Sequence, residues 1–307
     1  MKRAENLSRR DFIRCVLAAA LIPWKEQVSM ADDILTKAIP KTGERLPAIG
    51  LGTWQTFDVG GSESARAPLR TALREFVRAG GTVIDSSPMY GKSEAVTGEL
   101  AAELDVQKKV FLATKVWTSG RDAGIRQMQE SYKRLRTARM DLMQVHNLVD
   151  YRTQLSTLRD WQEQGKVRYI GVTHHTASAY DELARVLSRE ELDFVQLNYS
   201  LAERDAEKRL LPLAAEKRLA VLINRPLAAG NLFNRVLGRP LPPWANEVGC
   251  ATWAQFFLKF VISHPAVTCA IPATSKVQHL SDNMRAAFGL MPDASARERM
   301  ARYVAGL

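Results

Sequence analysis

The sequence predicts an α/β protein: a closed (β/α)8 barrel of the TIM type, with a β-hairpin before it and one extra helix after it. Strand-like and helix-like segments alternate eight times along the chain. The strand-like segments are continuous apolar runs, as expected of parallel strands that are buried on both faces. The length of 307 residues also suits one large barrel domain.

The eight predicted strand–helix pairs follow one another without a linker rich in Pro, Gly or Ser. Helical spacing places Leu69, Leu73 and Phe76 on one face of the first helix. In chain order the pairs are 48–53 with 67–78, 82–85 with 93–103, 110–115 with 123–135, 141–146 with 154–164, 167–173 with 177–188, 194–197 with 206–216, 220–224 with 252–263, and 268–272 with 278–288. A doubly wound open sheet is the alternative, but no G-x-G-x-x-G loop follows the first strand.

Three further segments complete the predicted fold. Residues 37–47 are predicted to form a hairpin that turns at Thr42 and Gly43. Residues 294–304 are predicted to form the extra C-terminal helix. The irregular stretch 226–249 follows the seventh strand and is longer than such connections usually are, which favours a functional loop.

The first 31 residues have the pattern of a twin-arginine export signal. Residues 7–14 read LSRRDFIR, a mildly apolar run follows over 15–23, and small residues stand at Ser29 and Ala31. The apolar run is too short to span a bilayer, so no stable membrane insertion is predicted. We therefore expect cleavage after Ala31, the twin-arginine machinery as a partner, a periplasmic location and a single barrel domain over 32–307. A basic amphipathic helix in a cytoplasmic protein is the alternative.

Composition narrows the possible functions. The formal charge is +10, but the basic residues are scattered through helices that also carry acids, which is typical of solvated faces. No nucleic-acid-binding module is recognisable. No cysteine or histidine cluster has the spacing of metal ligands, so no metal is predicted. Whether Cys250 and Cys269 pair is left open by the sequence.

Four polar residues lie at or just past the ends of three successive predicted strands. Asp85, Lys115 and His146 close the second, third and fourth strands, and Tyr90 lies in the loop after the second. The C-terminal ends of barrel strands carry the catalytic groups, and neighbouring strands are about 5 Å apart. We therefore expect these four residues, called the tetrad below, to share one mouth.

The tetrad has the groups that carbonyl reduction needs. A phenol has a pKa of about 10, and a nearby ammonium lowers this value, while a carboxylate holds the ammonium in place. Tyr90 would donate a proton to a carbonyl oxygen as hydride reaches the carbon, and His146 would orient that oxygen. Each residue alone also has a structural interpretation, such as a core histidine for His146. The four together favour catalysis.

The surrounding motifs resemble those of the aldo-keto reductases, from about residue 46 to residue 287. The matching segments are GLGTW (50–54), YGKSE (90–94), ATK (113–115), VHN (145–147), GVT (171–173), QLNY (196–199) and IPATS (271–275). The resemblance implies that Asp85, Tyr90, Lys115 and His146 form the catalytic tetrad, with Tyr90 as general acid. It also implies that Trp54 lines the substrate pocket.

The same resemblance implies NADPH as the cofactor, with NADH possible. The implied cofactor contacts are Thr53, Thr173, His174, Gln196, Arg225, Leu227, Ser275, Lys276 and Asn283. Thr173 and Gln196 would hold the nicotinamide carboxamide, and the start of the last barrel helix would hold phosphate, because helix N-termini favour anions. Lys276 would meet the 2′-phosphate, although a solvated lysine at a helix start is the alternative.

Three positions depart from the family pattern. Thr173-His174 replaces the usual Ser-Asn, and Asn224-Arg225 stands where a tyrosine commonly stacks on the nicotinamide. His279 stands where an arginine often contacts the 2′-phosphate. An asparagine cannot stack on the nicotinamide ring as a tyrosine does, so this chain is expected to contact the ring differently. Arg225 would either bind a phosphate of the cofactor or form a salt bridge under the loop.

The sequence thus predicts an exported NADP-dependent oxidoreductase that reduces a small aldehyde or ketone to an alcohol. The alternative is a cofactor-binding protein of the same fold, with little turnover, that senses redox state or regulates a partner. The complete tetrad argues against it, because a pure binder needs no proton donor. An isomerase of the same fold would need acids where this chain has a Lys–Tyr pair.

Overall fold

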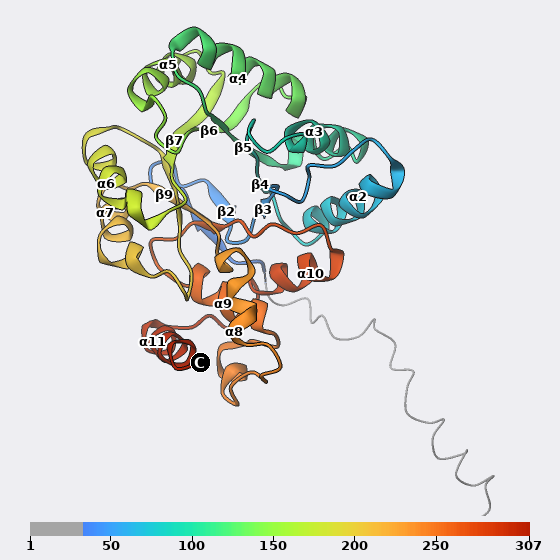
Figure 1. The fold of residues 1–307 in the computed structure, drawn as a ribbon, viewed down its shortest axis with the longest axis vertical. Coiled ribbons are helices and arrows are strands. Elements are labelled where there is room, and N and C mark those ends of the chain that lie inside the picture. The colour runs from blue at the N-terminus through green and yellow to red at the C-terminus, as the bar shows by residue number, and fades with distance from the viewer. Residues whose placement is uncertain (1–32) are drawn as a thin grey trace, which may run out of the picture. The chain divides into compact units, whose positions relative to one another are not determined.

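A sheet of eight parallel strands organises residues 33–307, the part of the chain that the computed structural model describes (Figure 1). The strands are β3 (Leu51–Gly52), β4 (Val83–Asp85), β5 (Phe111–Val116), β6 (Met140–His146), β7 (Val167–Thr173), β8 (Phe194–Asn198), β9 (Ala220–Asn224) and β10 (Cys269–Ala270). Each strand pairs with the next one along the chain. A doubly wound sheet would reverse its strand order partway, so that alternative is excluded.

Contacts between the first and last strands close the barrel. Ile49 forms a parallel bridge with Ala270, and Gly52 forms one with Ala273. Glycine makes this approach possible, because a Cβ on Gly52 would lie 2.8 Å from the carbonyl oxygen of Ile271. Isolated bridges replace a continuous ladder here, so β3 and β10 are shorter than the predicted strands 48–53 and 268–272. The predicted (β/α)8 barrel is confirmed.

Helices alternate with the strands and surround the sheet (Figure 1). They are α2 (Glu63–Arg78), α3 (Ser93–Glu103), α4 (Arg121–Leu135), α5 (Tyr151–Glu163), α6 (Tyr180–Arg189), α7 (Leu210–Glu216), α9 (Trp253–Ile262) and α10 (Val277–Arg285). The predicted helices 177–188 and 206–216 each begin with a separate 3₁₀ turn, η2 (Ala177–Ala179) and η3 (Asp205–Lys208). Short 3₁₀ turns commonly precede α-helices, and sequence periodicity does not separate the two.

The stretch 226–249 is more ordered than predicted. It contains η4 (Ala228–Gly230), the short helix α8 (Asn231–Arg235) and η5 (Ala245–Val248). A helix of five residues is too short to produce a visible 3.6-residue repeat, which explains why sequence analysis missed it.

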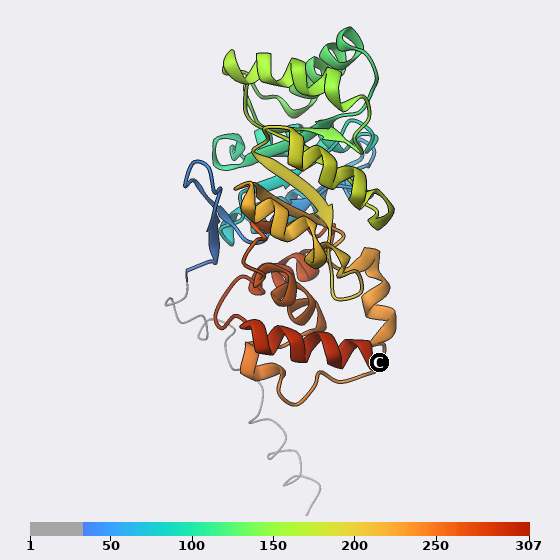
Figure 2. The ribbon, with the colours of Figure 1, turned by 90° about the vertical axis from the view of Figure 1, so that its left-hand side faces the viewer.

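The predicted hairpin and C-terminal helix are both present. Strand β1 (Thr36–Ala38) pairs antiparallel with β2 (Arg45–Pro47), and Gly43 has a φ of +80° in the turn. Ile39 and Leu46 pack with residues such as Phe111 and Phe194 at the starts of barrel strands, so the hairpin covers the N-terminal end of the barrel (Figure 2). Helix α11 (Ala294–Ala305) begins at Asp293, whose Oδ1 accepts a hydrogen bond from the Ala296 N–H at 2.8 Å.

Three further expectations concern the export signal, membrane insertion and the two cysteines. The predicted export signal over 1–31 lies outside the described residues. Within 33–307, no helix is both long enough and apolar enough to cross a bilayer. Cys250 and Cys269 are both buried free thiols, so they do not pair.

Candidate active site

The barrel brings the tetrad together at the C-terminal ends of adjacent strands. Asp85 is the last residue of β4 and His146 the last of β6. Lys115 lies one residue before the end of β5, and Tyr90 lies in the loop between β4 and α3. The Lys115 ammonium is 5.1 Å from the centre of the Tyr90 ring, whose centroid is 6.0 Å from that of His146. The predicted cluster is therefore present.

Lys115 and Asp85 form a buried ion pair. Lys115 Nζ donates to Asp85 Oδ2 at 2.6 Å and to the carbonyl oxygen of Ser86 at 2.7 Å. Burial alone would lower the pKa of Lys115, but the charge of Asp85 and the hydrogen bond to it outweigh burial and raise the pKa. Lys115 therefore stays cationic and holds a fixed positive charge beside Tyr90.

The environment of Tyr90 keeps its phenol protonated. Burial is the largest influence and raises the pKa of Tyr90, while the charge of Lys115 and a hydrogen bond from it act in the opposite direction. The lowered pKa predicted from the sequence is therefore wrong, because the motif shows the neighbouring ammonium but not the loss of solvent around the phenol. A protonated phenol beside an ammonium is suited to donating its proton.

His146 is held neutral. Burial, followed by the charge of Lys115, lowers the pKa of His146 to about 2. Its Nδ1 lies 3.1 Å from the Ser87 hydroxyl. Asn147 follows His146 with a φ of +52°, a left-handed conformation that asparagine tolerates better than most residues. This turn ends β6 at the histidine and leaves its ring at the mouth of the barrel.

A glycine sets the loop that carries Tyr90. Gly91 has a φ of +58°, and a Cβ there would lie 2.4 Å from the Asp58 carboxylate. That carboxylate accepts a hydrogen bond from the Lys92 N–H at 2.9 Å, which ties the start of α3 to the loop after β3. A side chain at position 91 would collide with this carboxylate and would be strained by the positive φ, so the loop favours glycine there.

Of the two residues predicted to hold the nicotinamide carboxamide, Gln196 contacts the tetrad and Thr173 contacts Gln196. Gln196 Nε2 donates to Asp85 Oδ1 at 2.8 Å, and the Thr173 hydroxyl donates to Gln196 Oε1 at 3.2 Å. His174, partly buried beside them, accepts a bond through its carbonyl oxygen from Asn224 Nδ2 at 3.3 Å. These residues form one connected rim over the ion pair.

Thr53, another predicted cofactor contact, has its hydroxyl engaged between two strand ends. It is fully buried, and its hydroxyl donates to the carbonyl oxygen of Asp85 and lies 3.0 Å from the Ser86 hydroxyl. These bonds hold the end of β3 against the end of β4. The hydroxyl would have to give them up before it reached a ligand.

The buried polar atoms near this rim that have no partner among the described residues include Asn224 Oδ1 and Arg225 Nε. Arg225 has a φ of +50° and reaches Glu203 only at 3.8 Å, so the salt bridge that sequence analysis considered is long and leaves Nε unused. Leu227, partly buried, follows in the same loop. Unpaired buried polar atoms are costly, and a polar ligand would satisfy them.

The start of α10 is open to an anion. Lys276 is its N-cap, no side chain caps the first turn, and that turn contains no acid. Ser275 is partly exposed and Lys276 is exposed, whereas Asn283 lies on the buried face of the helix. The uncapped N–H groups and the lysine charge both favour a phosphate.

Sequence analysis missed two apolar side chains at the mouth. Trp54, Met89 and Trp117 are 47%, 41% and 42% exposed, and they lie in the loops after β3, β4 and β5. Only Trp54 was predicted to contact substrate. The available signal for Trp117 was a large apolar residue two positions after the predicted strand 110–115.

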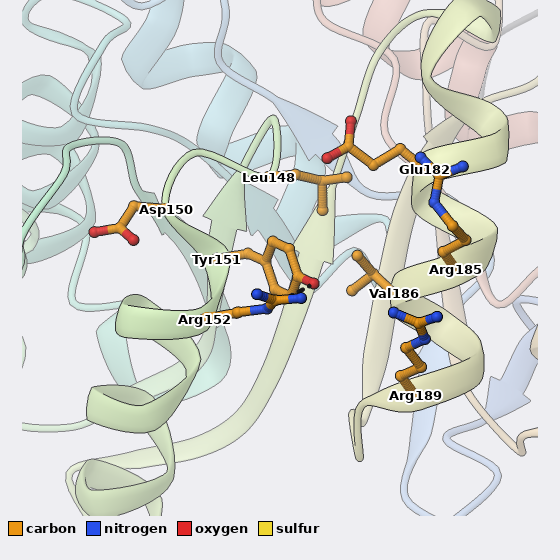
Figure 3. Close-up of a pocket in the computed structure, with 8 residues that line it drawn as sticks. All are labelled: Leu148, Asp150, Tyr151, Arg152, Glu182, Arg185, Val186 and Arg189. Carbon is orange, nitrogen blue, oxygen red and sulfur yellow. Dashed lines mark hydrogen bonds between the residues drawn. The ribbon is translucent and has the colours of Figure 1, made fainter.

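A separate cavity of about 360 Å³ lies on the outside of the barrel, between α5 and α6 (Figure 3). Arg152 lies against the Tyr151 ring at 5.6 Å, and Arg185 and Arg189 project from α6. None of the residues that line it belongs to the tetrad. Among residues 33–307, no group of three or more His, Cys, Asp or Glu side chains is arranged to hold a metal ion.

Comparisons with known proteins agree with this geometry. The model of the aldo/keto reductase family matches residues 48–298. A methylglyoxal reductase of Escherichia coli, YeaE, is 33% identical over 248 residues, which cover 78% of this chain and 84% of that protein.

Solved structures give the same result. An aldo/keto reductase from Klebsiella pneumoniae in complex with NADP and acetate is 30% identical, with a TM-score of 0.73, over 85% of this chain and 93% of that one. A second Klebsiella pneumoniae aldo-keto reductase, in complex with NADPH, is 29% identical with a TM-score of 0.75, over 88% and 96%. The match to the family model and the similarity to these relatives, together with the barrel fold and the tetrad, show that the chain belongs to the aldo/keto reductase family.

Proposed function

We propose that this protein reduces a small aldehyde or ketone to an alcohol, with NADPH as the hydride source and Tyr90 as the proton donor. The chain is an NADP-dependent oxidoreductase of its family. The observation that carries the specific proposal is a protonated phenol next to a buried Lys115–Asp85 pair and a neutral His146. No other described group at the mouth combines an acidic proton with a fixed positive charge.

The residues present fit a nicotinamide dinucleotide. Thr173, His174 and Gln196 would hold the carboxamide end, and the unpaired Asn224 Oδ1 offers one further acceptor. Arg225, through its unpaired Nε, suits the pyrophosphate, and Leu227 lies two residues further along the same loop. Ser275 and Lys276, just before α10, and Asn283 within it suit the adenosine end. When bound, the cofactor supplies hydride to the carbonyl carbon.

The tetrad moves the proton. Tyr90 donates its proton to the carbonyl oxygen as that oxygen gains charge, and the fixed ammonium of Lys115 stabilises the phenolate that remains. Asp85 keeps the ammonium in place. Neutral His146 orients the carbonyl oxygen through a hydrogen bond, without itself titrating. The exposed side chains of Trp54, Met89 and Trp117 would form the apolar part of the substrate pocket.

The proposal is tested by following NADPH oxidation with a panel of aldehydes and ketones that includes methylglyoxal, because the Escherichia coli relative bears that name. Steady turnover with at least one carbonyl compound is expected, and lower turnover when NADH replaces NADPH. Tight NADPH binding without appreciable turnover on any member would instead support a cofactor-binding regulator.

The pH dependence of reduction follows from the shifted pKa values. His146, with a pKa of about 2, remains neutral, and Tyr90, with a raised pKa, remains protonated well into the alkaline range. We expect kcat/KM for reduction to be flat from about pH 5 to pH 9 and to fall only as Tyr90 deprotonates above that. The ordinary pKa of a histidine is 6.5. A change of kcat/KM with an apparent pKa near that value in the wild type, absent in His146→Gln, would contradict the assignment of a neutral His146.

Lys276 is expected to select the phosphorylated cofactor. Replacing it with alanine should raise KM for NADPH roughly two- to fivefold, because an exposed ion pair contributes up to about 1 kcal/mol. KM for NADH should hardly change. Arg285→Ala, at the other end of α10, is the matched control and should alter neither value. Equal effects of Lys276→Ala on both cofactors would remove the 2′-phosphate contact from the proposal.

We further propose that the protein is exported to the periplasm by the twin-arginine route. The motif over 7–14 supports this. Because that route carries folded proteins, a cofactor bound beforehand would travel with the enzyme. N-terminal sequencing of a periplasmic fraction should find Asp32 or a near neighbour first. A protein present only in the cytoplasm with Met1 intact would overturn the proposal.

A further inference from the structure

A serine hydroxyl outside the tetrad contacts the catalytic-site histidine. Ser87 Oγ lies 3.1 Å from His146 Nδ1, and the exposed fractions of the two residues are 0% and 5%. No described residue hydrogen-bonds the other ring nitrogen, Nε2. The two residues are 59 positions apart in the chain, and the register of β4, β5 and β6 brings them together.

The surroundings decide which of the two atoms donates. Ser87 Oγ already accepts a long hydrogen bond from the Met89 N–H at 3.4 Å, and its own O–H has no other acceptor among the described residues. If Nδ1 carried the ring proton, that O–H would be buried without a partner. A buried unpaired donor is costly, so the O–H donates to Nδ1.

The ring proton must then be on Nε2. A neutral imidazole has one N–H and one acceptor nitrogen, and the acceptor here is Nδ1. The buried position of His146 and the nearby ammonium of Lys115 oppose a second proton on the ring. His146 therefore presents an N–H on its free nitrogen at the barrel mouth, where a carbonyl oxygen needs a donor.

We propose that Ser87 is a positioning residue: its hydroxyl holds His146 in the tautomer whose Nε2–H donates to the substrate oxygen. The effect of Ser87 on catalysis rests on the proposed carbonyl reduction, whereas the tautomer of His146 follows from the hydrogen bonds alone. Removing the hydroxyl releases the ring to rotate or to exchange tautomers. The fraction of molecules with a correctly placed donor then falls.

The test uses the full-length protein with ¹⁵N-labelled histidine. In the wild type, Nδ1 of His146 should give the NMR signal of an unprotonated nitrogen and Nε2 that of a protonated one. His146→Gln identifies the signals by their loss. In Ser87→Ala the Nδ1 signal should move, because its hydrogen-bond donor is gone. These spectra need neither substrate nor turnover, so they separate this inference from the proposed function.

Kinetics supply the second measurement. Ser87→Ala should lower kcat for reduction roughly three- to tenfold, the effect of one neutral hydrogen bond, with KM for NADPH unchanged. Ser131→Ala, which removes another fully buried serine hydroxyl on α4, is the matched control and should leave kcat unchanged. A protonated Nδ1 in the wild type, or equal kcat values for the two serine variants, would overturn the proposal. If Ser87→Ala fails to fold, the wild-type spectrum alone decides.

Discussion

Replacing Tyr90 with phenylalanine is expected to lower kcat for carbonyl reduction by roughly 10²- to 10⁴-fold, the range that a positioned general acid contributes. The phenol is the proton donor next to the ammonium of Lys115, and no described neighbour replaces it: Lys115 is committed to Asp85 and Ser86, and His146 is neutral. The ring itself stays, so its packing against His146 should persist. Stopped-flow measurement of NADPH oxidation gives the rate.

The control for this variant is cofactor binding. NADPH affinity, measured by quenching of tryptophan fluorescence, should remain within about twofold of the wild type, because the proposal assigns the Tyr90 hydroxyl to the substrate oxygen and not to the cofactor. A Tyr90→Phe enzyme that retains most of its kcat would place the proton donor elsewhere. Loss of both binding and turnover would indicate a disturbed mouth rather than a missing acid.

Replacing Lys115 with methionine is expected to cost about 3–5 kcal/mol of unfolding free energy, because it leaves a buried carboxylate without its partner. The exposed fractions of Lys115 and Asp85 are 0% and 2%, and their atoms lie 2.6 Å apart. Reduction should also be abolished, since nothing then stabilises the phenolate of Tyr90. Urea unfolding followed by circular dichroism measures the first effect.

A double variant separates stability from chemistry. Combining Lys115→Met with Asp85→Asn removes both charges, and an uncharged pair of similar volume often restores stability. In the wild type, Gln196 Nε2 and Gln144 Nε2 donate to Asp85 Oδ1 at 2.8 and 3.4 Å. The oxygen of an asparagine at position 85 can accept the same two hydrogen bonds. We expect most of the lost unfolding free energy to return and activity to stay absent. A single Lys115→Met variant as stable as the wild type would show that the ion pair does not behave as described.

The order of the elements was readable from the sequence because the barrel strands are buried, mostly apolar runs, and several of them end at a polar residue. Asp85 and His146 end β4 and β6 as predicted, and the hairpin turns at Gly43. Element limits were less readable. Strand β5 continues one residue past Lys115 to the buried Val116, and α2 begins at Glu63 rather than at residue 67.

Details of the site that arise between distant segments were not readable. Ser87 contacts His146, and Gln196 contacts Asp85, across 59 and 111 positions. Sequence spacing cannot reveal such pairs, because they depend on which strands are neighbours and on their register.

By itself, the sequence determined the barrel, the residues that meet at its mouth and the kind of chemistry they suit, since burial patterns and strand ends are local properties of the chain. Only the tertiary structure decided the protonation of the site. The pKa of Tyr90 is raised and not lowered, and that of His146 falls to about 2, because the folded barrel removes both from water. Desolvation is a property of the whole packed molecule, so no local motif contains it.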